Sequence, residues 1–320
     1  DAIEMREVDG DTIMMRARFV QSHREVVLAA RTRIGSEIPS EGVERNIDQS
    51  SAEIAKLLSI EVSAGEEVSI EKVVSLYTSR DSAISEPEIS ALAEVAQAGD
   101  FSHLADAHQR AWANLWSVFD VGITASTNDD TDKKLRLHIF HLLQTTSPHC
   151  IELDVGIPAR GWHGEAYRGH IFWDELFIFP FINLRMPMIT RALLLYRFRR
   201  LPEARRAARR AGYAGAMFPW QSGSSGREET QSLHLNPLSQ RWLPDVTHRQ
   251  RHVNAAIVYN VWQYFQVTED IEFLVTYGAE LILDIVRFWV SLAEFDTTRR
   301  RSLIRGVMGP DEFHTAGSNK

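Results

Sequence analysis

The sequence predicts a chain in two parts, a β-sheet region followed by a region that is nearly all helix. From residue 1 to about residue 80, apolar and polar residues alternate, which is the period of a strand with one buried face. After Asp81 the period changes to 3.6 residues, which is typical of amphipathic helices. The 320 residues, 44% of them hydrophobic, are enough for one large domain or two smaller ones.

The first region consists of short candidate strands. Two of them carry apolar residues on a single face each, Ile13, Met15, Ala17 and Phe19 in one and Val26, Leu28 and Ala30 in the other. Residues 58–62 and 68–70 alternate in the same way around a turn at residues 63–66, which predicts a hairpin. Together these segments predict a β-sandwich, or part of one.

The second region contains a series of candidate helices. They are predicted at residues 103–119, as a link between domains, and at 131–145, 174–200 with breaks near Pro180 and Pro187, 203–211, 249–266 and 270–294. Helix pairs separated by long loops favour a helical toroid over a solenoid. Residues 218–245 are rich in Gly, Ser and Pro and exceed an ordinary connection in length, so they are a candidate wall of a functional site.

Charge and cysteine content argue against several classes of function. A net charge of −8 offers no electrostatic surface for nucleic acid. Cys150 is the single cysteine, and the 12 histidines match no metal motif, so neither a disulfide nor a metal site is expected. The longest apolar run, residues 176–184, is far shorter than the roughly 20 residues that span a bilayer. We therefore expect a cytoplasmic protein without metal, cofactor or membrane segment.

Arginines form the most basic run of the chain, at Arg197, Arg199, Arg200, Arg205, Arg206, Arg209 and Arg210. Glu203 interrupts the run, and aromatic residues are sparse within it. We therefore interpret it as a solvated helix face.

Residues 161–175 combine glycine with aromatic, acidic and basic side chains. Sugar rings have apolar faces and hydroxyl edges, so a sugar site needs aromatic platforms beside groups that form several hydrogen bonds. The side chains suited to that task are Trp162, Arg168, Trp173 and Asp174. A structural interpretation is also open, with the tryptophans in the core and Asp174 as a helix N-cap.

Two further segments are candidates. In residues 218–230 the glycines permit a tight backbone path, and Trp220 and Gln221 are suited to sugar contact, although a flexible surface loop has the same composition. In residues 309–314, Glu312 has the carboxylic acid that glycoside cleavage requires to protonate the leaving oxygen. The alternative there is a helix start, with proline in the first turn and acids favoured by the helix dipole.

Taken in order, these segments resemble glycoside hydrolase family 65, the disaccharide phosphorylases that act on maltose, trehalose, kojibiose and related α-glucosides. The resemblance covers nearly the whole chain and is carried by residues 68–81, 161–175, 218–220, 252–264 and 309–314. It implies the end of an N-terminal β-sandwich at residues 1–82, a helical linker at residues 83–130 and an (α/α)6 barrel from residue 131. Residues 131–320 would be about the first half of that barrel.

The resemblance also implies roles for individual residues. Glu312 matches the general acid, and Trp173 and Asp174 match the contacts to the non-reducing glucose. Secondary candidates are the pocket neighbours Trp162, Arg168 and His170, and the loop residues Trp220 and Gln221. Gln221 stands where the family often has Glu, which bears on the acceptor subsite and on the choice of disaccharide.

The implied reaction is inverting phosphorolysis. Glu312 would protonate the glycosidic oxygen while inorganic phosphate, as co-substrate, attacks the anomeric carbon of an α-linked glucose disaccharide from the opposite face, giving β-glucose 1-phosphate. A homodimer is a further candidate assembly. Two alternatives stay open, an inverting α-glucoside hydrolase of the acid trehalase type and a non-catalytic carbohydrate-binding protein.

The ends of the sequence suggest a truncated chain. It has no initiator Met and no signal-peptide pattern, and the family's phosphate-pocket motifs are not in it. Half a barrel would expose apolar helix faces, so we expect the isolated piece to be inactive and to be poorly stable or to associate.

Overall fold

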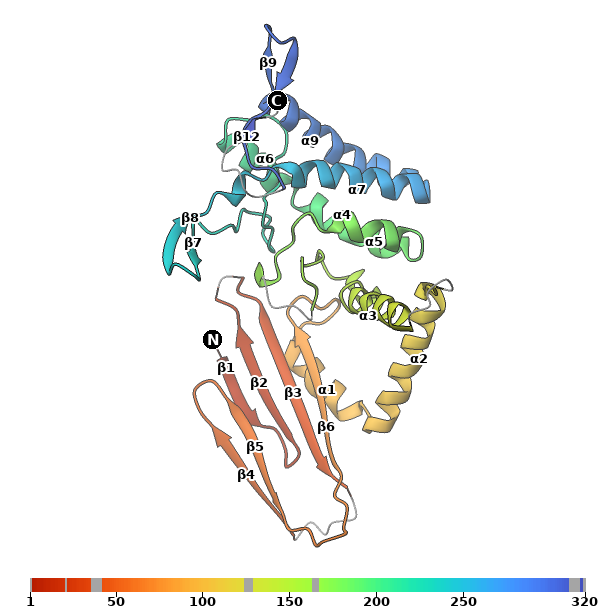
Figure 1. Cartoon of the computed structure of the whole chain (residues 1–320). Coiled ribbons are helices and arrows are strands. Elements are labelled where there is room, and N and C mark those ends of the chain that lie inside the picture. The colour runs from red at the N-terminus through yellow and green to blue at the C-terminus, as the bar shows by residue number, and fades with distance from the viewer. Residues whose placement is uncertain are drawn as a thin grey trace. The chain divides into compact units, whose positions relative to one another are not determined.

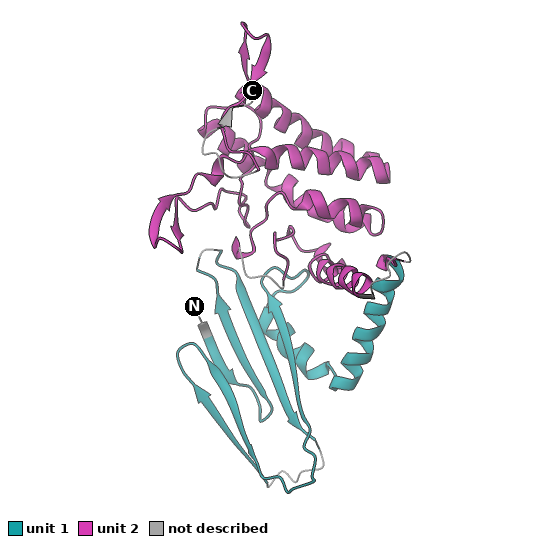
Figure 2. Ribbon diagram, in the orientation of Figure 1, with its two compact units in different colours: residues 1–118 teal, residues 119–320 magenta. Residues whose placement is uncertain are grey.

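The computed structural model of the chain describes residues 2–20, 22–35, 42–123, 129–162, 167–310 and 317–318 (Figure 1). Two compact units, Asp1–Val118 and Phe119–Lys320, each have a core of their own (Figure 2). The first is built around a sheet and the second is mostly helical, so the predicted order of a sheet region and a helical region is confirmed. The sandwich, the barrel and the domain bounds at residues 82 and 130 stay predictions.

The first unit contains a four-stranded antiparallel sheet in the order β1-β2-β3-β6, and a separate two-stranded hairpin, β4-β5. The strands are β1 (Ala2–Glu7), β2 (Thr12–Arg18), β3 (Glu25–Ile34), β4 (Val43–Gln49), β5 (Ile54–Ile60) and β6 (Ile70–Thr78). The hairpin predicted around residues 63–66 is wrong, because β5 pairs with β4 and β6 pairs with β3. The turn itself is present, since the Glu66 N–H donates to the Ser63 carbonyl at 3.1 Å.

Helix α1 (Pro87–Gln97) packs against β3 and β6 and covers one face of the sheet. The core between them consists of Met14, Val27, Ala29, Val73, Ala91 and Val95. Met15 and Leu28, one from each of the two predicted apolar faces, lie opposite each other in the register, and both are only half-buried. The fully buried face is therefore the other one, because it faces α1.

Arg31 ties α1 to the sheet through the carbonyl groups at the end of the helix. Its guanidinium is buried and donates to the carbonyl of Val95 at 2.7 Å, and also to the carbonyl of Gly99. The last carbonyls of a helix have no partner within it, and a cation there also interacts favourably with the helix dipole. Arg31 satisfies these groups in a place that water reaches poorly.

The helical unit follows α2 (Phe101–Phe119), which reproduces the helix predicted at residues 103–119. Its α-helices are α3 (Asp129–Thr145), α4 (Glu175–Asn183), α5 (Pro187–Arg199), α6 (Leu201–Arg210), α7 (His252–Thr268), α8 (Ile271–Phe273) and α9 (Ala279–Leu292), with a π-helical turn at Leu274–Gly278. All the helices expected from the 3.6-residue period are present. Within the described ranges, no helix is long and apolar enough to span a bilayer.

The helices of this unit pack against both sequence neighbours and helices far apart in the chain. Helix α4 contacts α5 and α7, α5 also contacts α7, and α9 contacts both α7 and α6. Pro180 lies inside α4 rather than at a break, whereas Pro187 starts α5 as predicted.

The Gly, Ser and Pro-rich stretch contains a short hairpin, β7 (Leu233–Asn236) with β8 (Arg241–Pro244). Further short strands are β9 (Glu294–Asp296), β10 (Arg301–Leu303), β11 (Arg305–Val307) and β12 (Gly317–Ser318).

The interpretation of the arginine run as a solvated face is wrong for two of its members. Arg197 is 1% exposed and Arg200 is 5% exposed, whereas Arg206 is 53% exposed in its side chain. The run spans α5 and α6, and the last turn of α5 points these two side chains into the unit. Charge density along the sequence does not reveal which face of a helix is covered.

Candidate active site

Short antiparallel bridges bring together the two candidate segments of this unit. The Ile171 N–H donates to the Ser222 carbonyl, and the Ser222 N–H donates to the Ile171 carbonyl, both at 3.0 Å. Further bridges join Pro158 to Ile171 and Ser222 to Glu228. The structure therefore brings residues 167–175 and 218–230 of the two candidate segments together, which their separation in the sequence did not establish.

Two predicted tryptophans from these segments flank one histidine. The ring centroid of His252 lies 4.7 Å from that of Trp173 and 5.0 Å from that of Trp220, both in edge-on geometry. Phe172 packs edge-on against Trp220 at 5.1 Å. Such T-shaped contacts are favourable for aromatic rings and leave little rotational freedom. The cluster packs around both tryptophans, of which Trp220 is only 6% exposed and Trp173 is half-buried, so Trp173 is the one that can present a ring face to a ligand.

Asp174 directly precedes α4 but does not cap it. Its side chain makes no hydrogen bond to the first N–H groups of the helix, so the structural alternative for this residue is not supported. Burial raises the pKa of the Asp174 carboxyl above its ordinary value. A half-buried carboxylate that caps no helix can accept hydrogen bonds from a ligand.

Gln221 is held in place by a carboxylate that sequence reasoning missed. Glu228 accepts hydrogen bonds from the N–H groups of Trp220, at 2.9 Å, and Gln221, at 3.1 Å, and from the hydroxyl of Thr230, at 2.6 Å. These contacts fold residues 220–230 into a closed turn. The segment is thus a hydrogen-bonded turn that can serve as a wall of the candidate site.

The remaining predicted neighbours are more peripheral. Trp162 is 75% exposed. Arg168 has a positive φ of 52°, and its guanidinium lies beside the side-chain amide of Gln231. The His170 Nδ1 lies 2.8 Å from the carbonyl oxygen of Tyr167, and its ring borders Gly223. The structure brings Arg168 and His170 to the wall formed by residues 218–231, and leaves the Trp162 side chain largely in solvent.

A buried ion pair underlies the Trp173-Asp174 segment. The Arg197 Nη2 donates to Glu175 Oε2 at 2.9 Å and to the carbonyl of Phe172 at 2.6 Å. Burial raises the pKa of the Glu175 carboxyl, and the Arg197 charge opposes that rise. Arg197 therefore binds the backbone of Phe172 before Trp173 and the side chain of Glu175 after Asp174.

Glu312, the predicted general acid, lies outside the described residues. The residue just before its motif, Met308, is buried, and its N–H donates to the carbonyl of Arg249 at 3.1 Å. Arg249 is three residues before His252. The segment that precedes the motif therefore starts beside the helix end that carries the central histidine.

The site also contains residues that the sequence did not single out. The main ones are His252, Glu228 and Arg197. His252 lay in the family-like helix 252–264, Glu228 in the candidate segment 218–230 and Arg197 in the arginine run, without a role of its own. The roles of His252 and Arg197 depend on contacts across 22 to 79 positions of the chain, which no local pattern records, whereas Glu228 contacts residues within eight positions. Within the described ranges, no group of three or more His, Cys, Asp or Glu side chains is placed to hold a metal ion.

Comparison with known proteins identifies the family. Residues 136–320 match the model of the glycosyl hydrolase family 65 central catalytic domain, and residues 2–115 match that of the family 65 N-terminal domain. The chain belongs to glycosyl hydrolase family 65.

Individual relatives agree with this assignment. The chain is 48% identical over 309 residues to an uncharacterized glycosyl hydrolase of Mycobacterium tuberculosis, covering 97% of this chain and 23% of that protein. It is 40% identical over 272 residues to the trehalose 6-phosphate phosphorylase of Lactococcus lactis, covering 84% of this chain and 35% of that protein. The chain thus spans about a quarter to a third of the relatives it matches.

A solved structure shows the same fold. It is provisionally described as a kojibiose phosphorylase from the human microbiome, and it superposes with a TM-score of 0.78 over 99% of this chain and 40% of that one. At 20% sequence identity, the likeness concerns the fold alone.

Proposed function

We propose that this chain carries the glucose-binding part of an enzyme that cleaves an α-glucosidic disaccharide by inverting phosphorolysis. The observation that carries the proposal is the arrangement of three aromatic rings and one carboxylate. Trp173 and Trp220 pack against His252, and beside them lies Asp174, whose side chain does not cap helix α4. Family membership and a relative named trehalose 6-phosphate phosphorylase support it. The fold we propose for the whole protein is a β-sandwich, a helical linker and an (α/α)6 barrel.

In the proposed binding mode, the apolar face of the non-reducing glucose stacks on an aromatic ring and its hydroxyl groups bond to a carboxylate. Trp173 supplies the ring, and Asp174, as the ionised carboxylate, accepts from the hydroxyls. Gln221, held by Glu228, faces the acceptor sugar and contributes to the choice of disaccharide. Arg168, His170 and Trp162 line the outer part of the site.

The chemical step needs one acid and one nucleophile. Glu312 gives its proton to the glycosidic oxygen as the bond from that oxygen to the anomeric carbon breaks, and an oxygen of inorganic phosphate bonds to that carbon from the opposite face. The products are β-glucose 1-phosphate and the released sugar. Phosphate is the nucleophile, so the enzyme itself supplies no base.

The test uses the full-length gene product that contains this chain. It is incubated with trehalose, trehalose 6-phosphate, maltose, kojibiose and nigerose, with and without phosphate, and β-glucose 1-phosphate and glucose are measured. We expect β-glucose 1-phosphate that depends on phosphate, from one of these sugars. Glucose released equally without phosphate would identify a hydrolase instead, and sugar binding without any product would identify a carbohydrate-binding protein.

A further inference from the structure

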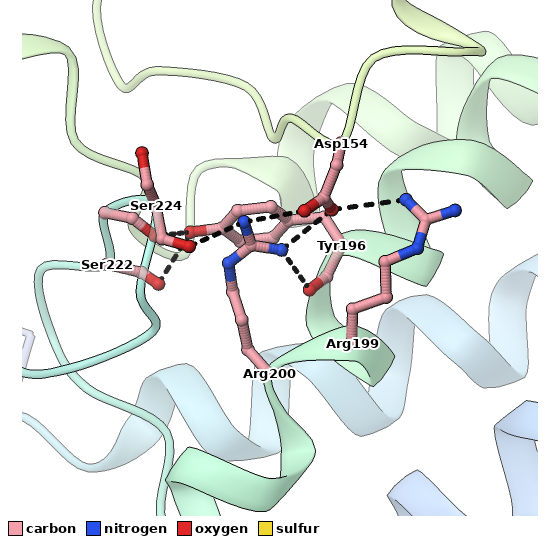
Figure 3. A network of polar contacts seen from close by, with 7 residues as sticks. Asp154, Tyr196, Arg199, Arg200, Ser222 and Ser224 are labelled. Atoms are coloured by element: carbon pink, nitrogen blue, oxygen red, sulfur yellow. Dashed lines mark hydrogen bonds and ion pairs between the residues drawn. The ribbon is translucent and has the colours of Figure 1, made fainter. Parts of the chain in front are cut away.

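Two side chains at the end of α5, Tyr196 and Arg200, contact the wall formed by residues 218–231 (Figure 3). The Tyr196 hydroxyl donates to the carbonyl of Gly223 at 2.6 Å, and it therefore accepts from the hydroxyl of Ser222 at 2.7 Å. Tyr196 is buried, so both bonds lie away from water. The turn that follows Gln221 is thus anchored to α5 at two consecutive residues.

Arg200 continues this anchor one turn further along the helix. Its guanidinium donates to both carboxylate oxygens of Asp154, at 2.8 and 3.0 Å, and to the carbonyl of Ser224 at 2.8 Å. The same group stacks on the Tyr196 ring, with its central carbon 3.6 Å from the ring centroid. The planar guanidinium group suits these contacts. It binds both oxygens of the carboxylate and still has an N–H that donates to the loop.

The loop has the backbone that this junction requires. Gly226 has a φ of 75°, and a Cβ there would lie 2.7 Å from the Cβ of Arg200. The turn at residues 222–226 therefore wraps closely around the Arg200 stem. With the Ile171–Ser222 bridge on its other side, Ser222 is held from two directions.

We propose that Tyr196 and Arg200 are positioning residues for the acceptor subsite, acting by holding the turn at residues 222–226 and, through it, Gln221. This proposal rests on the proposed function for the identity of the subsite. Arg197, on the same turn of α5, instead holds Phe172 and Glu175, so the glucose subsite has a separate support. The two subsites should therefore respond independently to substitutions in α5.

The experiment is the reverse reaction, in which the acceptor sugar and β-glucose 1-phosphate have separate KM values. Tyr196→Phe keeps the ring that stacks on Arg200 and removes both loop bonds. We expect the KM for the acceptor to rise about tenfold, which corresponds to about 1.4 kcal/mol, with the KM for β-glucose 1-phosphate changed less than about twofold. Arg200→Met should act in the same direction, and Arg200→Lys should recover only part of the affinity.

Two matched controls separate positioning from general loss of stability. Tyr264→Phe removes another buried tyrosine hydroxyl, which donates to Asp270 at 2.8 Å and does not contact the loop. Arg199→Met removes the other arginine on Asp154, which donates to it at 3.2 Å. Both controls should leave the acceptor KM unchanged. Equal effects of Tyr196→Phe and Tyr264→Phe on the two KM values would overturn the proposal.

Hydrogen exchange supplies a readout that does not require activity. In the Tyr196→Phe variant, amides of residues 220–229 should exchange faster than in the parent, whereas in Tyr264→Phe they should not. Unchanged exchange in Tyr196→Phe would show that the Tyr196 hydroxyl does not hold the turn at residues 222–226. Faster exchange with unchanged KM values refutes its role in the acceptor subsite. If the parent has no activity on any disaccharide, the proposed function fails and the subsite assignment with it, while exchange still decides whether α5 holds the turn.

Discussion

The buried pair of Arg197 and Glu175 predicts a large and pH-dependent loss of stability when the arginine is removed. The two side chains are 1% and 2% exposed. Arg197→Met keeps most of the buried stem but leaves the Glu175 carboxylate without its cation. Removing one partner of a buried pair typically costs about 3–5 kcal/mol. Arg206→Met removes a 53% exposed arginine from Glu203, and Glu203 keeps its contact with Arg210 at 3.3 Å, so it should cost only about 0–1 kcal/mol.

The pH dependence follows from the pKa of Glu175. Burial raises that pKa in the parent, and loss of the Arg197 charge raises it further. A carboxyl group with a raised pKa in the folded state favours folding while it is protonated, and this contribution is lost as pH rises through the folded-state pKa. The stability gap between Arg197→Met and the parent should therefore be small in acid and widen toward neutral pH.

The measurement is urea unfolding of the full-length gene product, followed by tryptophan fluorescence at pH 5 and pH 8. At pH 8, Arg197→Met should lower the midpoint by about 1 M or more. The double variant of Glu175→Leu with Arg197→Met should recover most of this loss, because neither charge is then buried alone. If Arg197→Met shifts the midpoint no more than Arg206→Met does, the ion pair is not buried in solution and the reasoning is refuted.

Three further predictions concern chemistry and backbone. Glu312→Gln should lower kcat by about 10²–10⁴-fold with intact folding, and a loss below tenfold would remove Glu312 from the acid role. Asp174→Asn should lower kcat/KM without lowering the melting temperature, because the Asp174 side chain caps no helix. Its pH–rate profile should also lose the acidic limb of the parent, since only the ionised Asp174 carboxylate accepts hydrogen bonds from the sugar. Gly215→Ala should destabilise the protein far more than Gly212→Ala in thermal unfolding. Both glycines have positive φ, but only at Gly215 would a Cβ lie 2.1 Å from the Asp284 carbonyl oxygen.

Local patterns determined the character of each part of the chain. The change of period after Asp81 separated the sheet region from the helices, because side-chain spacing in strands and helices depends on backbone geometry alone. The helix at α2 was predictable for the same reason, and the start of α5 at Pro187 because proline suits the first turn of a helix. The family resemblance, carried by segments such as residues 161–175, pointed to the tryptophans and the aspartate of the site before any contact was known.

Only the tertiary structure decided which partners these elements choose. The alternation around residues 63–66 fitted a hairpin, yet β6 pairs with β3, because strand pairing depends on which edge is available in space. The arginine run looked uniform in the sequence, yet Arg197 and Arg200 are buried where the last turn of α5 faces two site segments. Burial and pairing arise from contacts between residues far apart in the chain, and the side chains that hold the site were found there.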